Sequence, residues 1–430
     1  MLKRRNPYGL ALMRIGVIVL IALYLILFAI PRRLKTTKSP SAAVELPPEI
    51  YGYEDNTIVY QPAANLSEQF NRMVERAYRG HEPLTILHIG DSHIQADFFT
   101  GEVRQLLSSW LDDDYTSRGF TFPFQVAGSN NPEDYSITSQ GEWRVNKFND
   151  TTETAYLGIA GIALTTRDPS ARLSIRLHHG EQRFQRFDII NIFYGTNGMD
   201  VVPRPTTPSQ MVKQGDGHVS YRLNEPVDSI TIELAGQFSP KGRLSIFGFD
   251  LQNSRAKLIY HAVGLNGANV RTHLRSRNFG HGLSHLNPQV VIVSLGTNDA
   301  YSDAFNVRAF GSNLLLLISK IQQVLPHALV ILTTPGDHLI NREKPNEALE
   351  QVRAEIYRIA GEMNCGVWDF YRIMGGAGSI NTWAEMGMCA NDKLHFNSKG
   401  YRLQGALLYS ALVKLSQHHP LDERKSPAYE

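Results

Sequence analysis

Residues 84–93 read LTILHIGDSH, an apolar run that ends in a polar tetrapeptide. The run at 84–89 is typical of a buried strand, and a helical pattern follows it. Ser92 is therefore expected at the turn where a strand leads into a helix. Aspartate and serine also cap helices at such turns without any catalytic role, so this tetrapeptide alone is a weak signal.

A second polar segment lies far downstream, where residues 392–395 read DKLH. At the spacing of Asp392 and His395, one turn of chain can hold a carboxylate against an imidazole. A serine hydroxyl is a poor nucleophile near neutral pH and needs a base within hydrogen-bond reach. Ser92, His395 and Asp392 are therefore candidates for a nucleophile, its base and the group that orients the base.

Strand-like runs alternate with helix-length stretches over most of the chain. The expected strands are residues 84–89, 257–263, 289–295, 328–333 and 366–370. The expected helices, with apolar positions three or four residues apart, are residues 98–111, 270–277, 304–324, 346–363 and 399–417. This alternation predicts an α/β fold in which helices cover both faces of a parallel sheet. Ligands of such sheets bind at the carboxyl ends of the strands, where Ser92 stands.

Residues 115–255 separate the first strand–helix unit from the second and differ from both in their residue pattern. Gly, Pro, Thr and Ser punctuate short alternating runs there. The expected strands are residues 171–178, 188–194, 217–223, 229–234 and 243–249. Because these runs alternate or are rich in β-branched and aromatic residues, they predict an inserted β domain, for which a jelly roll or a similar sandwich fits.

The N-terminus carries an apolar run at residues 15–30, extended by residues 10–13 across Arg14. Its length approaches the roughly 20 residues that span a bilayer. No small-residue cleavage site precedes Pro31, which favours an uncleaved anchor over a signal peptide. Basic residues flank the run on both sides, so charge does not decide its orientation. The prolines, serines and threonines of residues 31–62 predict a spacer.

The composition of the chain limits the kinds of partner that it is expected to bind. The chain has 430 residues, of which 42% are hydrophobic and 20% charged, as expected for a folded protein of more than one unit. Its formal net charge is +2, and no basic stripe with aromatic residues is present, so nucleic acid is not an expected partner. Histidine pairs such as His281 and His285 lack the carboxylates of zinc motifs, so no metal or other cofactor is expected.

Cys365 and Cys389 are the only cysteines, which argues against a disulfide scaffold and a cysteine-rich zinc site. A bond between them outside the cytoplasm and two buried thiols both fit the sequence, because spacing gives no distance.

Two loop segments at strand ends offer donors for a developing oxyanion. Attack on an ester carbonyl places negative charge on its oxygen, and one preorganised donor stabilises that charge by about 3 kcal/mol. Asn298 follows one expected strand in a GTND segment, and Gly267 follows another after Asn266. Each segment taken singly is also ordinary turn chemistry.

The segments that carry Ser92, Gly267, Asn298 and His395, in this order, resemble the SGNH hydrolases, an esterase superfamily also called GDSL-like. The resemblance implies a flavodoxin-like three-layer α/β/α core in which Ser92 attacks an ester carbonyl. It implies that the backbone N–H groups of Ser92 and Gly267 and the Asn298 amide hold the oxyanion. His395 would then move the proton and Asp392 would orient it. The resemblance says nothing direct about the insert.

Two features narrow the resemblance. His93 stands where many family members carry leucine or another apolar residue, and Gly264 is an alternative to Gly267 as the glycine of the second block. A GDSH block, a long β-rich insert and the GLNGA segment at 264–268 together look like the peptidoglycan O-acetylesterase branch. That resemblance implies a carbohydrate-binding-like insert and a catalytic part in the periplasm, outside the cytoplasmic membrane. Asp91 and His93 are expected to support the first block.

The expected units are a cytoplasmic stub with its anchor (1–34), a linker and lead-in (35–82), a hydrolase core in two parts (83–114 and 256–418), the insert (115–255) and a tail (419–430).

The expected function is removal of O-acetyl or other small acyl groups from a cell-envelope polysaccharide such as peptidoglycan. The alternatives are an O-acyltransferase with the same triad and an inactive, anchored glycan-binding protein.

Overall fold

The apolar run of residues 84–89 forms the strand β2 (Leu84–Gly90), and each of its seven residues is buried. On one side β2 pairs in parallel with β14 (Leu258–Gly264), and on the other with β15 (Val290–Ser294). A parallel strand that is covered on both faces carries a nearly continuous apolar run, which is why the sequence reveals it. The computed structural model describes residues 55–148, 156–178, 186–301 and 304–416.

The central sheet has the order β1-β19-β16-β15-β2-β14. Its remaining strands are β1 (Ile58–Val59), β19 (Gly366–Trp368) and β16 (Leu329–Thr333). In chain order the parallel strands lie second, first, third, fourth and fifth, which is the flavodoxin-like arrangement. β1 adds an antiparallel edge. The order reverses between β2 and β15, and ligands of such sheets bind outside the carboxyl ends of the strands at that point.

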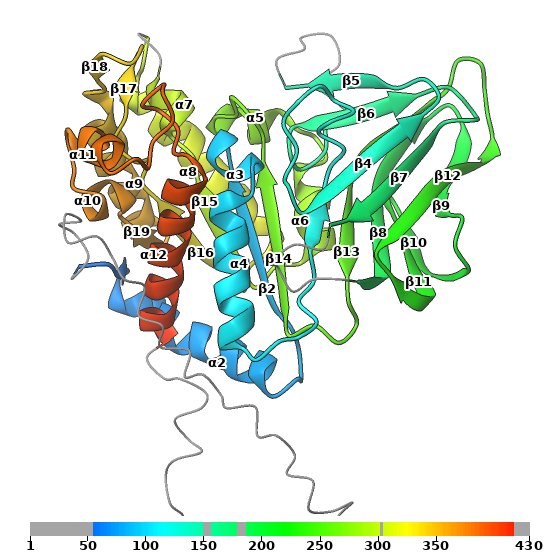
Figure 1. Cartoon of the computed structure of the whole chain (residues 1–430), viewed down its shortest axis with the longest axis horizontal. Coiled ribbons are helices and arrows are strands. Elements are labelled where there is room, and N and C mark those ends of the chain that lie inside the picture. The colour runs from blue at the N-terminus through cyan, green and yellow to red at the C-terminus, as the bar shows by residue number, and fades with distance from the viewer. Residues whose placement is uncertain (1–54, 149–155, 179–185, 302–303, 417–430) are drawn as a thin grey trace, which may run out of the picture. The chain divides into compact units, whose positions relative to one another are not determined.

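Helices cover both faces of the sheet (Figure 1). One layer contains α2 (Leu66–Tyr78), α4 (Phe98–Trp110) and α12 (Ser398–Ser416), and α12 contacts both of the others. The other layer contains α5 (Val270–Arg275), α6 (Phe279–Leu286), α8 (Val307–Val324) and α9 (Ala348–Glu362). The shorter elements are η1 (Pro62–Ala64), α3 (Ser92–Gln95), α7 (Thr297–Ala300), α10 (Phe370–Ile373), α11 (Ser379–Glu385), β17 (Leu339–Ile340) and β18 (Lys344–Pro345). The expected α/β/α core is confirmed.

Two core elements, β1 and α2, lie within the expected linker and lead-in at residues 35–82. Next to β1, Asn56 accepts a hydrogen bond from Trp368 Nε1 at 2.9 Å and donates one to Leu407 O at 2.8 Å. α2 buries one face, made of Leu66, Ser67, Phe70, Val74 and Ala77. The prediction of a spacer up to residue 62 is therefore wrong from Asn56 onward. β1 is too short to show alternation, and the apolar positions of α2 stand among charged residues.

The residues between α4 and β14 form two antiparallel sheets. The first has the order β10-β11-β8-β13-β6-β5, with β3 pairing with β13, and the second has the order β4-β7-β12-β9. The strands are β3 (Gly119–Thr121), β4 (Tyr135–Gln140), β5 (Arg144–Lys147), β6 (Ile162–Thr166), β7 (Arg172–Leu177), β8 (Phe187–Asn197), β9 (Asp200–Pro205), β10 (Ser209–Gly215), β11 (His218–Val227), β12 (Ser229–Gln237) and β13 (Arg243–Gln252). The expected strands of this stretch correspond to β7, β8, β11, β12 and β13.

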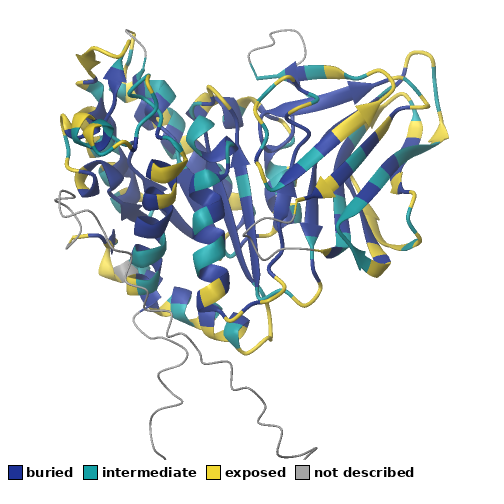
Figure 2. Ribbon diagram, viewed as in Figure 1, coloured by how far each residue is buried: buried dark blue, intermediate teal, exposed yellow. Residues whose placement is uncertain are grey.

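The two antiparallel sheets bury their facing sides together. β7 and β9 bury every second residue, as strands with one solvated face do. Leu173 and Ile175 of β7 belong to the same hydrophobic cluster as Ile190 and Ile192 of β8, and this cluster continues to Leu87 of β2. The buried interior therefore runs without a break from these sheets into the α/β core (Figure 2). A jelly-roll topology and a carbohydrate-binding role stay predictions.

The expected anchor at residues 15–30, most of the spacer and the tail at 419–430 lie outside the described residues. In the part of the chain that the structure describes, no helix combines the length and apolarity needed to cross a bilayer. Cys365 and Cys389 are both free thiols.

Gly264, at the end of β14, lets α3 lie against the sheet. A Cβ atom at this position would lie 2.3 Å from Gln95 N and 2.8 Å from Asp91 O, which are both backbone atoms. Because backbone atoms cannot move aside singly, Gly264→Ala must displace the turn that carries Ser92. We predict that this variant loses about 1–3 kcal/mol of unfolding free energy in a denaturant titration.

Gly280→Ala in α6 is the matched control, because the nearest atom to its added Cβ, Val324 Cγ2, lies at 3.7 Å. An equal loss of stability in both variants would contradict this account of Gly264.

Candidate active site

The structure brings Ser92, His395 and Asp392 together. Ser92 begins α3 directly after β2, and the other two residues lie in the turn that precedes α12. Ser92 Oγ lies 2.8 Å from His395 Nε2, and His395 Nδ1 lies 2.8 Å from Asp392 Oδ2. Each contact is a hydrogen bond, so the hydroxyl, the imidazole and the carboxylate form one chain. This is the arrangement expected from the spacing of Asp392 and His395 and from the position of Ser92 at the end of a strand.

The turn at residues 392–395 is built around the Asp392 carboxylate. Its Oδ1 accepts the backbone N–H groups of Leu394 at 3.0 Å and His395 at 2.9 Å. Lys393 between them has a φ of 49°, which closes the turn. Partial burial acts to raise the pKa of Asp392, but the hydrogen bonds from His395 and Leu394 outweigh it and hold the pKa below its usual value. The carboxylate therefore stays charged beside the His395 ring.

Asn298 lies in α7, just after β15. Its Nδ2 donates a hydrogen bond to Ala268 O at 2.8 Å and a longer one to Asp91 Oδ2 at 3.3 Å. Asn298 therefore links the loop after β14 to the turn after β2. Three of the expected segments meet here because β14, β2 and β15 are neighbours in the sheet and end at the same edge.

The structure separates the two glycines of the GLNGA segment. Gly264 is the last residue of β14 and packs against the backbone of α3. Gly267 lies in the following loop with a φ of 74°, in a turn closed by a hydrogen bond from Ala268 N to Leu265 O at 2.9 Å. Its N–H donates to no other described residue. Gly267 is therefore the better candidate donor, and Gly264 has a packing role.

Asp91 is a buried carboxyl in the turn before Ser92. Its side chain accepts the backbone N–H of His93 at 3.0 Å, in addition to the Asn298 contact. Burial raises the pKa of Asp91 to about 7, although the hydrogen bond from the His93 backbone and the nearby His395 work against the rise. Asp91 thus lies beside the triad without belonging to its hydrogen-bond chain.

The ring of His93 packs against the imidazole of His395. Its ring centroid lies 5.1 Å from that of His395, with an interplanar angle of 31°. Its Nδ1 forms a hydrogen bond of 2.9 Å with Tyr401 OH of α12. Burial, and then the proximity of His395, hold the pKa of His93 well below its usual value. His93 is therefore a neutral ring that supports one side of His395.

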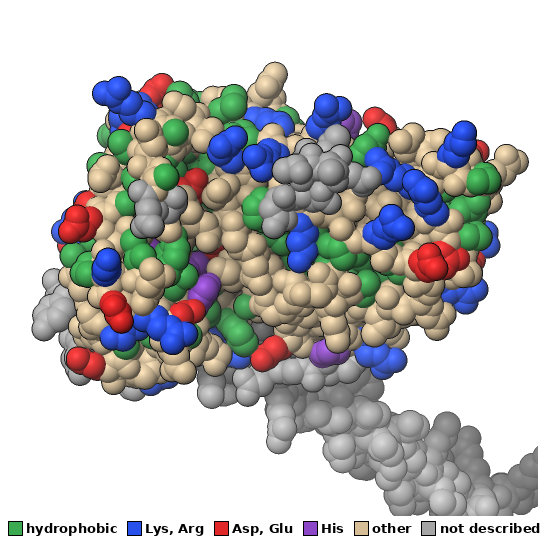
Figure 3. All heavy atoms as spheres, turned by 90° about the horizontal axis from the view of Figure 1, so that it is seen from above, with side chains coloured by type: hydrophobic (Ala, Val, Ile, Leu, Met, Phe, Trp, Pro, Cys, Tyr) green, Lys and Arg blue, Asp and Glu red, His purple; other side chains and the backbone are tan. Residues whose placement is uncertain are grey.

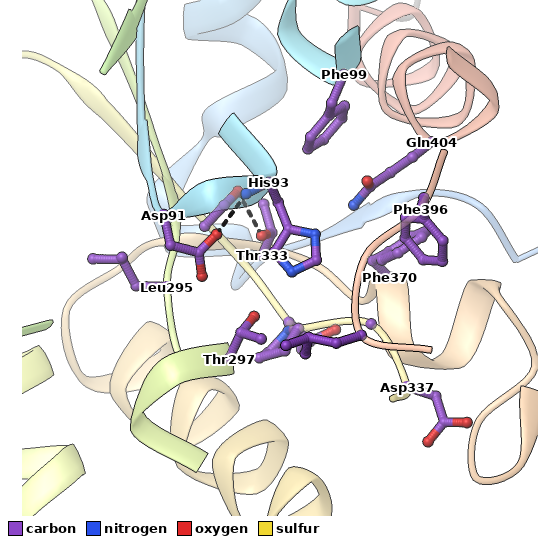
Figure 4. A pocket seen from close by; sticks show the side chains of 15 residues that line it. Asp91, His93, Phe99, Leu295, Thr297, Thr333, Asp337, Phe370, Phe396 and Gln404 are labelled. Atoms are coloured by element: carbon purple, nitrogen blue, oxygen red, sulfur yellow. Dashed lines mark hydrogen bonds between the residues drawn. The ribbon is translucent and has the colours of Figure 1, made fainter. Parts of the chain in front are cut away.

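A cavity lies beside the triad and has about 410 Å³ of empty space, its open mouth included (Figure 4). Asp91 and Leu295 lie on one side of it, and Phe396 and Gln404 lie opposite. Ser92 and His395 do not line it. The cavity therefore adjoins Asp91 and His93 but not the Ser92 hydroxyl.

The sequence analysis did not single out two polar neighbours of this site, Gln95 and Tyr401. Gln95 is buried at the end of α3, one turn after Ser92, and precedes the helix expected at residues 98–111, so no sequence signal marked it. Tyr401 looked like an ordinary residue of the last helix.

Within the described ranges, no group of three or more His, Cys, Asp or Glu side chains is arranged to hold a metal ion.

Comparisons with known proteins find one family model that matches part of the chain and several solved structures of similar fold. A family model described as the GDSL-like lipase/acylhydrolase family matches residues 228–403. The matched range contains Gly267, Asn298, Asp392 and His395 but not Ser92, which precedes the two antiparallel sheets in the chain. A search of the curated proteins finds no match.

Among solved structures, a peptidoglycan O-acetylesterase aligns at 22% identity over 81% of this chain and 96% of that chain, with a TM-score of 0.66. A lipase/acylhydrolase from Enterococcus faecalis aligns at 22% identity over 40% of this chain and 80% of its own, with a TM-score of 0.30. A family two carbohydrate esterase from Cellvibrio japonicus aligns at 11% identity over 66% and 99%, with a TM-score of 0.28. Over residues 228–403 the chain thus matches the GDSL-like (SGNH) hydrolase family, and its fold resembles that of a peptidoglycan O-acetylesterase; both findings support a carboxylic-ester hydrolase.

Proposed function

We propose that the protein is a serine esterase that removes O-acetyl groups from a cell-envelope glycan. The observation that carries this proposal is the hydrogen-bonded chain from Ser92 through His395 to Asp392. A hydroxyl at 2.8 Å from an imidazole nitrogen has its base in place, and a charged carboxylate behind the ring stabilises the imidazolium that forms.

In the proposed reaction, Ser92 Oγ attacks the acetyl carbonyl while His395 Nε2 takes the hydroxyl proton. The bond to the sugar oxygen then breaks, and that oxygen receives the proton from His395, which leaves acetyl-Ser92. Water attacks the acetyl-enzyme by the same route, and acetate leaves. Asp392 remains charged throughout and holds the ring of His395 in orientation.

The proposed oxyanion hole is formed by the backbone N–H groups of Ser92 and Gly267 and by the Asn298 amide. Gly267 supports this because its N–H is not used by another described residue. Of the two hydrogen bonds from Asn298 Nδ2, the 3.3 Å contact with Asp91 is the weaker, so this N–H is the one that can turn to a substrate oxygen. Donors fixed before the reaction are the largest single contribution in this class of catalysis.

The proposed substrate is an acetylated polysaccharide such as peptidoglycan. The likeness in fold to a peptidoglycan O-acetylesterase extends over most of both chains and supports this choice. On the face toward which the strand ends of the core point, Lys and Arg side chains are scattered and do not form one continuous stripe (Figure 3), which suits a glycan better than a nucleic acid.

The proposed location is the periplasmic side of the cytoplasmic membrane, with the apolar run at residues 15–30 as a single-pass anchor. An anchor of this kind would keep the enzyme beside the cell wall, and the antiparallel sheets would offer a surface for the polymer.

Asp91 and His93 are proposed as supporting residues. Asp91 accepts hydrogen bonds from the backbone of His93 and from Asn298, so it ties the nucleophile turn to the proposed oxyanion donor. His93 packs on the ring of His395 and is itself held by Tyr401.

Replacing the triad side chains should lower the rate in a graded way. We predict that Ser92→Ala lowers kcat by about 10⁶-fold and Asp392→Asn by about 10⁴-fold, because the second variant keeps the nucleophile but misorients its base. The rates are measured with p-nitrophenyl acetate, and circular dichroism checks the fold. Ser109→Ala, at an exposed position of α4, is the control and should keep the wild-type rate. Turnover by Ser92→Ala at the wild-type rate would refute the triad.

The full chain should release acetate from native O-acetylated peptidoglycan. Mass spectrometry of the reaction, with an added sugar acceptor, separates hydrolysis from transfer because water yields acetate and the acceptor yields an acetylated sugar. We predict that acetate is released and that no acetylated acceptor sugar is formed. Predominant transfer would favour the O-acyltransferase, and glycan binding without either product would favour the inactive binding protein.

The buried Asp91 carboxyl should make stability depend on pH. The folded protein keeps the Asp91 proton up to about pH 7, whereas the unfolded chain loses it near the usual value of 3.8. The stability associated with this proton is therefore fully present below about pH 4 and is lost as the pH rises toward 7. Asparagine has no such proton, so the stability of Asp91→Asn relative to wild type should improve between these pH values. Denaturant titrations across this range measure it, and a difference that does not change with pH would contradict the assignment.

A further inference from the structure

The loop at residues 265–268 presents the Gly267 N–H. Hydrogen bonds from other parts of the chain hold this loop at the residues before and after Gly267. Before it, Asn266 N donates a hydrogen bond to Gln95 Oε1 at 2.7 Å. After it, Ala268 O accepts Asn298 Nδ2 at 2.8 Å. The direction of the Gly267 N–H therefore depends on how well these two partners are themselves fixed.

Gln95 is fixed by the insert. Its side chain is 2% exposed, and its Nε2 donates to Ser129 Oγ at 2.8 Å and to Asn130 O at 2.7 Å, with Asn130 Oδ1 at 3.0 Å. The same amide thus uses its oxygen for the oxyanion loop and its nitrogen for the insert. The side chain of Asn266 adds a second link, because its Nδ2 donates to Asn130 Oδ1 at 2.6 Å.

The part of the insert that holds Gln95 is itself anchored to the core by buried charges. Arg118 Nε lies 2.5 Å from Asp134 Oδ2, and Arg118 Nη2 lies 3.1 Å from Asp97 Oδ2. Asp97 also pairs with Arg104 Nη1 of α4 at 2.9 Å. Residues 129 and 130 lie between Arg118, which pairs with Asp97 just before α4, and Asp134, whose Oδ2 lies 3.8 Å from Arg104 Nη1 of α4. Both ends of their segment are therefore tied to the first half of α4 and the residue before it. A buried charge that loses its partner is costly, which makes this arrangement rigid.

We propose that Gln95 is a positioning residue through which Ser129 and Asn130 of the insert fix the Gly267 N–H in the oxyanion hole. This inference rests on the proposed function, because it assigns a catalytic consequence to a network that contacts no reacting atom. The insert is then needed for the chemical step itself and not only for holding a polymer. A misplaced donor costs rate even when the substrate is too small to reach the insert.

The two roles of the insert predict different kinetics. If the insert only binds glycan, changes at Asn130 should leave the hydrolysis of p-nitrophenyl acetate untouched. If it positions the oxyanion loop, the same changes should lower kcat for this small ester and leave KM nearly constant.

The test compares Gln95→Leu and Asn130→Ala with the wild-type full chain on p-nitrophenyl acetate. Gln95→Leu removes both links, and we expect kcat to fall by about 10- to 100-fold. Asn130→Ala removes an exposed side chain, so it should fold normally, and we expect a smaller fall in the same direction. The double variant should lose less than the product of the two factors, because the changes act on one network.

Inhibition by phenylboronic acid distinguishes positioning from a loss of folded enzyme. This compound forms a tetrahedral adduct with a serine hydroxyl and imitates the transition state. If the oxyanion donor is displaced, the inhibition constant should rise in step with the fall in kcat/KM. If part of the enzyme is merely unfolded, kcat falls but the inhibition constant does not change. Ser220→Ala is the matched control, because it removes a hydrogen bond to Asn191 within the same insert, away from residues 129 and 130.

Unchanged kcat and unchanged boronate inhibition in both test variants would overturn the role of Gln95 and leave the esterase proposal intact. An equal loss in Ser220→Ala would also overturn it, since any weakening of the insert would then suffice. A wild-type chain that neither hydrolyses the ester nor binds the boronate would overturn the proposed function together with this inference.

Discussion

The hydrogen bond between Ser92 Oγ and His395 Nε2 joins two segments that are 303 residues apart in the chain. Nothing local holds them together, so their meeting depends on the sheet and on the helices that cover it. β2 fixes Ser92 at the edge where the strand order reverses, and α12 fixes His395 by packing against α4 and α2. The strand β17 adds a direct support, because Leu339 N donates to Lys393 O at 3.0 Å. Every other feature of the site is arranged around this bond.

The α/β core was predictable because its buried strands leave a strong pattern in the sequence. Strands buried on both faces leave unbroken apolar runs, and the ends of β2, β14, β15 and β16 lie within one residue of the expected limits. The last strand ends earlier than expected, at Trp368, because Asp369 caps α10 with a hydrogen bond from Arg372 N. The spacing of DKLH also predicts a local turn, which the structure contains. The choice between Gly264 and Gly267 needed coordinates, since only the packing of α3 shows which glycine is close to backbone atoms.

The strands of the insert were harder to predict from the sequence. β10 exposes nearly all of its residues and so shows no alternation, and β3 and β5 are too short for a period to appear. The role of Gln95 could not be predicted either, because its partner Asn266 is 171 residues away and its partner Asn130 is 35 residues away. A single glutamine in a short helix carries no pattern. Long-range polar networks of this kind become visible only when the segments are placed in space.

The central claim is that Ser92 is activated by its folded surroundings. The most direct measurement is labelling of the native full chain with a fluorophosphonate, a reagent specific for activated serines, followed by peptide mapping. The account predicts one adduct, on Ser92, that forms only in the folded protein and forms much more slowly in His395→Ala. A label on another serine, or equal labelling of Ser92 in the unfolded chain, would contradict it.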